Sequence, residues 1–405
     1  MSVTRLFRRY TVVFGLLGCL WVPIGALNGL FAWRASELLG PQAVAARQAR
    51  AGGLYGSALH DQELFDYKLA LVREARPEVV AIGSSRTLKL RHRFFRRPFI
   101  TMGGGIHTMQ DAYRALQEIS AAHPPSLVLL FPDYWWFNAA SAGSSAPSAQ
   151  SVSLAAGPVG GTVPHSASLL PPWMVLPSKW LWQGRVTAGD YWRTVLGRPG
   201  RVPYPTYGIL ALSGSRGYAA DGAYYDLQFL AEGHRAGVTR FSVLTEEAAK
   251  GNPSFRYGEA VDPQAWALLE EAIRLAAERG VRVIVVAAPV APSVVTQMRA
   301  LDPRYAYVEA FRRRLGTLAA AHYDFHDPQR LGLREAQFLD DVHATDAGYA
   351  KLIQAISADP ASGLAPYVAT AELEALISRY GEATTLPIDV AEFLPAAASP
   401  AGTHG

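Results

Sequence analysis

Cysteine is almost absent from this chain of 405 residues, with Cys19 as its single example. One thiol can form neither an intrachain disulfide nor a cysteine-based metal site. A strong excess of charge is also missing, because the net charge is only +4. A net charge this small does not indicate a protein that binds nucleic acid. Half of the residues are hydrophobic, so the chain can bury a large core and has room for more than one domain.

A long uncharged run, from Tyr10 to Trp33, lies near the amino terminus and follows three arginines: Arg5, Arg8 and Arg9. Spanning a bilayer takes about 20 mostly apolar residues, and the run is long enough even with Pro23 and Asn28 in it. The preceding arginines favour a cytoplasmic amino terminus, with everything after Trp33 outside the cytoplasm. The sequence therefore predicts a single-pass protein of the cytoplasmic (inner) membrane.

A cleaved signal peptide and a lipoprotein signal that ends in Cys19 are the two alternatives for this run. Apolar residues continue well beyond Cys19, and no small-residue cleavage site follows the run. Both observations favour an uncleaved membrane anchor.

A short strand followed by two serines is the centre of the predicted core. Val79 to Ile82 are apolar, lie between a proline and Gly83, and are typical of a strand buried on both faces. Ser84 and Ser85 follow at the end of this strand, where open α/β sheets place their sites. Ser85 is the candidate nucleophile. The alternative is that Gly-Ser-Ser is only a turn that ends the strand.

A possible base and its partner carboxylate occur near the other end of the chain, as Asp340 and His343. A serine becomes nucleophilic when a base takes its proton, and the base needs a carboxylate that fixes its tautomer. The spacing Asp-x-x-His supplies both groups, so Ser85, His343 and Asp340 are predicted to form a triad. Surface polarity is the plain alternative, and a metal site would need further ligands.

These motifs occur in an order that resembles the SGNH (GDSL-like) hydrolases. Residues 83–85 resemble the Gly-Asp-Ser of that family with Ser in place of Asp, and residues 340–343 resemble its last block. The glycines at 103–105 fall where the family has its oxyanion-hole glycine. The resemblance implies a three-layer α/β/α, flavodoxin-like domain with a parallel sheet. It also implies an oxyanion hole formed by the N–H groups of Ser85 and of Gly104 or Gly105.

Further segments are similar to the membrane-anchored branch of that superfamily, which includes proteins of teichoic-acid D-alanylation and alginate O-acetylation. The segments are Tyr67-Lys68, Gly83 to Arg86, Asp133 to Asn138 and Pro289 to Pro292. This similarity implies O-acylation of an envelope or extracellular polysaccharide with a membrane-bound O-acyltransferase as partner, and no cofactor or metal. The alternatives are an esterase that deacylates such a polymer, and an inert scaffold or glycan-binding component.

One block departs from the family pattern. Phe131-Pro132-Asp133 stands where the family has Gly-x-Asn-Asp, so the asparagine that donates to the oxyanion has no counterpart. Asn138, Trp135 or Trp136 could substitute, and the tryptophans could equally be core residues or a platform for a sugar ring. Arg86 is predicted either to bind an anionic group of the substrate or to pair with a carboxylate and brace the turn.

Other segments complete the predicted domain. Thr108 and Asp111 form a capping box, Leu127 to Phe131 and Val281 to Ala287 are buried strands, and a helix runs from Asp262 to Gly280. The basic run Lys89 to Arg97 is expected to be an exposed surface. His326 is expected to be structural or to lie at the edge of the substrate.

The predicted organisation has six parts. They are the cytoplasmic tip and anchor (1–35), a juxtamembrane linker (36–70), the first part of the core (71–138), an inserted loop and aromatic-rich segment (139–254), the second part of the core (255–360), and a C-terminal helix with a disordered tail (361–405).

Overall fold

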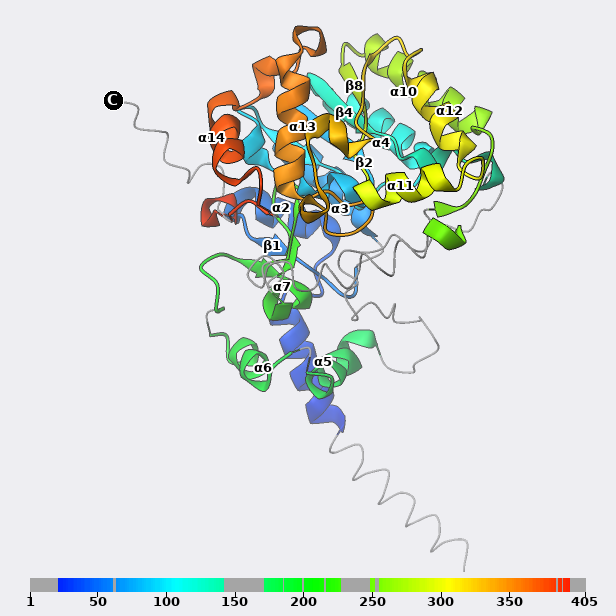
Figure 1. Cartoon of the computed structure of the whole chain (residues 1–405). Coiled ribbons are helices and arrows are strands. Elements are labelled where there is room, and N and C mark those ends of the chain that lie inside the picture. The colour runs from blue at the N-terminus through cyan, green and yellow to red at the C-terminus, as the bar shows by residue number, and fades with distance from the viewer. Residues whose placement is uncertain are drawn as a thin grey trace, which may run out of the picture.

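The computed structural model describes five stretches of the chain: residues 21–60, 63–141, 171–226 without 185, 199 and 215, 248–251, and 255–393 without 384 and 388. These residues form two β-sheets with helices packed around them (Figure 1). The coarse fold prediction, α/β with a parallel sheet, is confirmed.

The larger sheet has five strands in the order β3-β2-β4-β8-β9 among the described residues, and every neighbouring pair is parallel. The strands are β2 (Val79–Gly83), β3 (Phe99–Thr101), β4 (Leu127–Phe131), β8 (Arg282–Ala287) and β9 (Ala321–Asp324). All residues of β2, β3 and β4 are buried, which agrees with the apolar sequences of β2 and β4. Gly83 pairs with Phe131, so the residues that follow β2 and β4 emerge side by side at the carboxyl edge.

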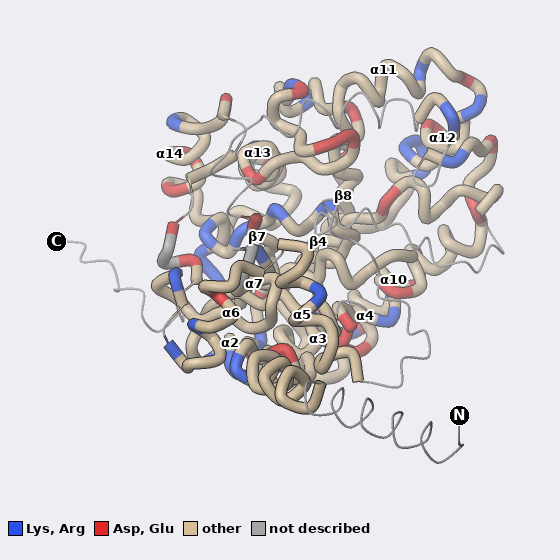
Figure 2. The backbone as a smooth tube through the Cα atoms, turned by 90° about the horizontal axis from the view of Figure 1, so that it is seen from below, with Lys and Arg blue, Asp and Glu red and all other residues tan. Residues whose placement is uncertain are grey.

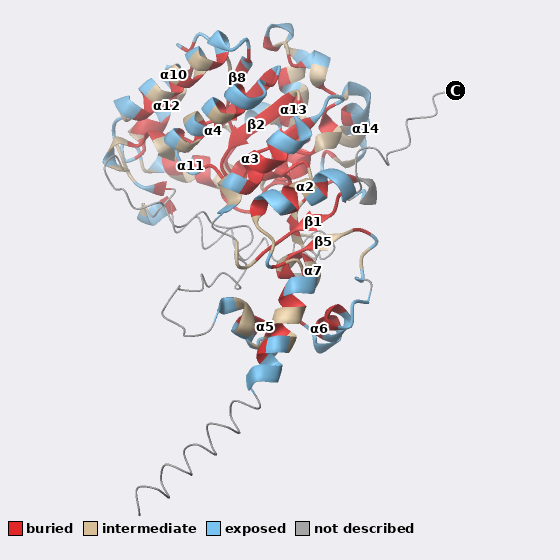
Figure 3. Ribbon diagram, turned by 180° about the vertical axis from the view of Figure 1, so that it is seen from behind, coloured by how far each residue is buried: buried red, intermediate tan, exposed pale blue. Residues whose placement is uncertain are grey.

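Helices cover both faces of this sheet. One face is covered by α3 (Leu64–Ala75), α4 (Met109–Ala122) and α10 (Pro263–Glu278), as the view from behind shows (Figure 3). In this layer α4 packs against α3 on one side and against α10 on the other. On the other face α13 (Asp346–Ala358) crosses in front of the sheet (Figure 1), and its Tyr349 contacts Phe131 of β4 edge-on. The remaining core helices are α11 (Pro292–Ala300), α12 (Ala306–Leu315) and α14 (Thr370–Tyr380).

Two predicted helix starts are confirmed in detail. Thr108 and Asp111 make the reciprocal bonds of a capping box at the start of α4. The Asp262 carboxylate accepts from the N–H of Gln264 at the start of α10, and Gly280 follows that helix with a φ of 71°. The starts of α4 and α10 could be predicted from the sequence because each capping side chain bonds to the backbone within one helical turn.

The smaller sheet was not predicted. Its strands have the order β5-β1-β6-β7 and are β1 (Leu54–Tyr55), β5 (Thr206–Tyr207), β6 (Arg216–Tyr218) and β7 (Tyr224–Asp226). The 36–70 segment is therefore more than a linker, since it contributes α2 (Pro41–Ala51), β1 and the first part of α3 to packed structure. Strands of two or three residues are too short to show the period-2 pattern by which strands are recognised.

Part of the predicted insertion is also structured, as helices α5 (Pro172–Trp182), α6 (Ala188–Val195) and α7 (Ile209–Gly214). Residues 142–170 and 227–247 of that insertion, and the predicted tail beyond 393, lie outside the described residues.

The predicted anchor is described only from residue 21, where a helix runs to residue 34. Its first half lies outside the described residues. Within the described part of the chain, no helix is both long and apolar enough to cross a membrane.

Candidate active site

The turn after β2 presents Ser85 to the solvent side of a buried segment. Between residues 79 and 91, Ser85 alone is not fully buried. Ser84 Oγ accepts from the N–H of Arg86 and so caps the 3₁₀ turn Ser85–Lys89. Gly83 has no room for a side chain, because a Cβ there would lie 2.6 Å from Thr87 and 2.9 Å from Phe131. The turn is therefore tightly packed beneath an accessible hydroxyl.

Ser85, His343 and Asp340 form one continuous hydrogen-bonded path. Ser85 Oγ lies 2.8 Å from His343 Nε2, and His343 Nδ1 lies 2.7 Å from both carboxylate oxygens of Asp340. His343 and Asp340 are each 2% exposed. The structure thus brings together the three residues that the sequence singled out, from positions 258 residues apart.

The Asp340 carboxylate is held ionised by its surroundings. Burial alone would raise its pKa, but the charge and hydrogen bond of His343 and the N–H groups of Val342 and His343 outweigh burial, so the pKa of Asp340 lies below its usual value. An ionised carboxylate can only accept, so Nδ1 of His343 carries a proton. Nε2 is then the ring nitrogen that can accept from the Ser85 hydroxyl.

The predicted glycine turn packs against the Ser85 turn. Thr101 Oγ1 lies 3.3 Å from the carbonyl oxygen of Thr87 and 3.1 Å from its hydroxyl. The N–H of Gly103 donates to Thr101 Oγ1, and the N–H of Gly105 donates to Met102 O at 3.3 Å. These bonds fix the glycines beside the residues that follow the candidate nucleophile.

Of the predicted oxyanion donors, Ser85 and Gly104 keep their amides available. Within the described part of the chain, neither backbone N–H has a hydrogen-bond acceptor. Gly104 has a φ of 82°, a conformation that favours glycine, and a Cβ at this position would lie 3.4 Å from the hydroxyl of Tyr218. The choice between Gly104 and Gly105 therefore falls on Gly104, because the Gly105 amide is used inside the turn.

Of the two roles predicted for Arg86, the structure favours bracing of the turn over binding of a substrate anion. It is 2% exposed, and its guanidinium pairs with Asp133 at 3.0 Å. Nε donates to Val342 O, and Nη2 donates to Ala288 O and Pro289 O. These contacts tie the Ser85 turn to the ends of β4 and β8 and to the loop that carries His343. Arg86 therefore braces the site, and no substrate anion can reach it.

Asn138 corrects one prediction. Its side-chain amide donates to the carbonyl oxygens of Arg256 and Tyr257, and its Oδ1 accepts from the N–H of Ala140. The residue is 2% exposed, so it is a structural link between β4 and the segment before α10 and not a donor to substrate.

Trp135 and Trp136 are half-buried against the main core. Trp135 lies edge-on to Tyr134 and over the guanidinium of Arg86, 5.5 Å from the ring centre. The Trp136 indole N–H is buried without an acceptor in the described residues. The role of these two rings in substrate binding stays a prediction.

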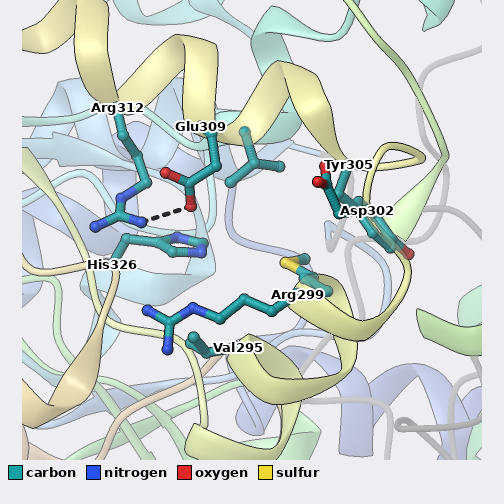
Figure 4. Close-up of a pocket in the computed structure, with 9 residues that line it drawn as sticks. Val295, Arg299, Asp302, Tyr305, Glu309, Arg312 and His326 are labelled. Carbon is teal, nitrogen blue, oxygen red and sulfur yellow. Dashed lines mark hydrogen bonds and ion pairs between the residues drawn. The ribbon is translucent and has the colours of Figure 1, made fainter.

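His326 lies in a separate cavity, of about 290 Å³, between α11 and α12 (Figure 4). Burial and the charges of Arg312, Arg86 and Arg299 hold its pKa well below the usual value, so the ring is neutral. It packs edge-on against Tyr134. Ser85 does not line this cavity, so His326 is not an alternative base for it.

Two buried basic side chains near the site were not predicted from the sequence. Lys89 and Arg91 were expected on an exposed surface, but they are 5% and 2% exposed and both donate to the carbonyl oxygen of Tyr224 in β7. Burial lowers the pKa of Lys89 to about 7, helped by the charge of Arg91 and opposed by Asp346, Asp226 and Asp340. The local sequence of basic residues contains no pattern that predicts burial beneath β7, because β7 is distant in the chain.

No family model, curated protein or solved structure matches this chain. Among the described residues, no group of three or more His, Cys, Asp or Glu side chains is arranged to hold a metal ion.

Proposed function

We propose that this chain is a serine acyl-transfer enzyme of SGNH type. The observation that carries the proposal is the unbroken path from the accessible hydroxyl of Ser85, through His343, to the buried Asp340 carboxylate. A base and an orienting carboxylate at hydrogen-bonding distance are what activates a serine hydroxyl.

The geometry supports a two-step reaction. Ser85 Oγ attacks the carbonyl carbon of an acyl donor while His343 Nε2 takes the hydroxyl proton, and Asp340 stabilises the imidazolium that results. The N–H groups of Ser85 and Gly104 are the candidate donors to the oxyanion. The tetrahedral intermediate collapses, and the leaving group departs with the proton from His343. The products of this first step are an acyl ester on Ser85 and the released leaving group.

In the second step an acceptor hydroxyl attacks the acyl-serine ester. His343 removes the hydroxyl proton and returns it to Ser85 Oγ when the bond between Ser85 and the acyl group breaks. A sugar hydroxyl as acceptor gives O-acylation, and water gives hydrolysis. The same three residues serve both outcomes, so the acceptor decides whether the enzyme is a transferase or an esterase.

For the acceptor we propose an envelope polysaccharide, modified outside the cytoplasm by a protein anchored through its amino-terminal helix. The support is the resemblance to the alginate and teichoic-acid proteins. A cytoplasmic acyl donor cannot cross the membrane through one helix, so a membrane-bound O-acyltransferase partner would deliver the acyl group. Tethering would raise the effective concentration of Ser85 near such a partner.

The test is the ester content of the envelope polysaccharide in a deletion strain that is complemented with the wild-type chain or with Ser85→Ala. Transfer predicts that esters are lost on deletion, restored by the wild type and not restored by Ser85→Ala. A rise in esters on deletion would replace transfer by deacylation. Full restoration by Ser85→Ala would show that the protein acts as a scaffold.

A further inference from the structure

The exposed apolar side chains of the described structure gather in one place. Every large hydrophobic residue that is exposed among those the structure describes lies between residues 21 and 38 or between 175 and 196. They are Trp21, Val22, Ile24, Trp33, Leu38, Val175, Trp182, Trp192 and Leu196. Trp182 is the most exposed, at 92%. We call the described residues 21–40 and 171–204, which contain the helix of residues 21–34, α5 and α6, the collar.

The collar is a packed unit and not a set of loose helices. Its own core contains Phe31, Trp180 and Tyr191, one from each helix. Phe31 stacks on Tyr191 with ring centres 4.8 Å apart. In Figure 1, α5 and α6 lie on either side of the N-terminal helix, beyond the main body of the protein.

Asn28 ties the three helices together by its polar atoms. Its Nδ2 donates to Met174 O at 2.6 Å and to Ser178 Oγ at 2.8 Å, both in α5. Its Oδ1 accepts from the hydroxyl of Tyr191 in α6 at 2.9 Å. The only strongly polar side chain of the described N-terminal helix before Arg34 is thus satisfied inside the collar, and a polar bond of this kind holds helices together in lipid.

Small residues allow α5 to approach closely. A Cβ on Gly25 would lie 2.6 Å from Met174, and one on Gly29 would lie 2.8 Å from the ring of Trp173. Glycines spaced four apart are the usual contact of helices that associate in membranes. The helix 21–34 therefore presents a face that is shaped for α5.

The charge on the collar has one sign. Of the described residues 21–40 and 171–204, the only acidic ones are Glu37 and Asp190, and both are buried. The exposed charged side chains are all basic: Arg34, Lys179, Arg193, Arg198 and Arg201, of which Arg201 is paired with Asp190. Figure 2 shows the backbone from this end, with Lys and Arg in blue and Asp and Glu in red. Tryptophan beside lysine and arginine is the composition of a surface that lies at the boundary between lipid headgroups and acyl chains.

We propose that the collar is a second membrane-contact site, in which α5 and α6 lie in the headgroup region of an anionic lipid bilayer beside the N-terminal helix. The ligand is the lipid surface itself. Glu37 links the collar to the segment after β1 and to the start of α7, because its carboxylate accepts from the N–H groups of Ala58, Leu59 and Ile209. This proposal rests on the membrane anchoring proposed above and not on the catalytic assignment of Ser85.

The test uses the full chain with Cys19→Ser, reconstituted in vesicles of phosphatidylcholine with or without phosphatidylglycerol. An environment-sensitive fluorophore is attached at Trp182→Cys, and in a matched variant at Ala277→Cys on the exposed side of α10. We expect the label at 182 to emit at shorter wavelength and to be quenched by nitroxide-labelled phospholipid, and the label at 277 to do neither. A label at 182 that behaves like the one at 277 would overturn the proposal.

The charge is tested by the same label. Quenching at 182 should be stronger with phosphatidylglycerol, and Lys179→Gln combined with Arg193→Gln should remove that difference. Equal quenching in both vesicles would overturn the preference for anionic lipid. A label at 182 that is aqueous in vesicles but shielded in native membranes would assign the collar to a protein partner and overturn the lipid assignment.

Discussion

Arg86 and Asp133 form an ion pair inside the protein, with Nη1 3.0 Å from Oδ1 and both side chains 2% exposed. The pair links the residue after the candidate nucleophile to the residue that follows the Pro132 turn at the end of β4. Removing one partner of a buried pair leaves an uncompensated charge, which costs about 3–5 kcal/mol.

We expect even Arg86→Lys, which keeps the positive charge, to destabilise the fold, because a lysine cannot reproduce the planar set of contacts to Asp133, Ala288 and Pro289. Thermal unfolding measures this loss. Arg97→Lys is the control, since the pair of Arg97 with Glu78 is 3.6 Å long and exposed. Equal melting temperatures for the two variants would contradict the bracing role.

Asp340→Asn should leave the fold intact and lower kcat by about 10⁴-fold, because an amide no longer fixes the His343 tautomer. The neighbouring Asp341→Asn is the matched control. Burial, with the charges of Asp340 and Glu335, raises the pKa of Asp341 to about 8, so this carboxyl is already neutral at neutral pH. Steady-state hydrolysis of an aryl acetate distinguishes the two, and a comparable loss in Asp341→Asn would remove Asp340 from its role.

Gly104→Ala should lower kcat, since removing one oxyanion donor costs about 10²–10³-fold. The substitution forces an alanine to adopt a φ of 82° beside Tyr218 and Leu88, which displaces the N–H. Gly332→Ala controls for backbone strain alone, because Gly332 also has a positive φ and its Cβ would meet open space. If both variants keep full activity, Gly104 does not contribute to the oxyanion hole.

Lys68 gives the fold a predictable dependence on pH. Burial lowers the pKa of its ammonium group to about 7, with Asp221 opposing the shift. Between that pH and the unfolded pKa of about 10.4, the unfolded chain binds more protons than the folded one, so stability rises with pH by up to about 1.4 kcal/mol per unit.

Lys68→Met removes the titrating group. The melting temperature of the wild type minus that of Lys68→Met should therefore increase when the pH is raised from about 7 to about 9. Thermal unfolding of both proteins in the same detergent checks this, and a gap that stays constant across the range would contradict the lowered pKa.

The sequence predicted those features that depend on neighbouring residues or on unbroken apolar strands. Val79 to Ile82, the Thr108 cap and the Asp262 cap are local signals, and the structure has them as expected. The convergence of Ser85 with His343 was predicted from the parallel strand order and from the resemblance of the motif order to that of a known family, not from local physics.

The remaining features depend on partners that are distant in sequence. Lys89 is buried because β7 covers it. The side-chain amide of Asn138 donates to the carbonyl oxygens of Arg256 and Tyr257 and is therefore not available to a substrate. The second sheet joins Leu54 to Thr206 through strands of two residues, which carry no periodic signal. Such pairings are set by tertiary packing, so the sequence offered no pattern from which to infer them.

The nucleophilic role of Ser85 is tested most directly by covalent capture. The full-length protein is treated with a fluorophosphonate that reacts with activated serines, and the modified residue is identified by mass spectrometry of its peptides. We predict one adduct, on Ser85, that is retained in Ser84→Ala and lost in Ser85→Ala. His343→Ala should greatly reduce it, because the serine then has no base. An adduct on another residue, or one that persists in Ser85→Ala, would contradict the proposed triad.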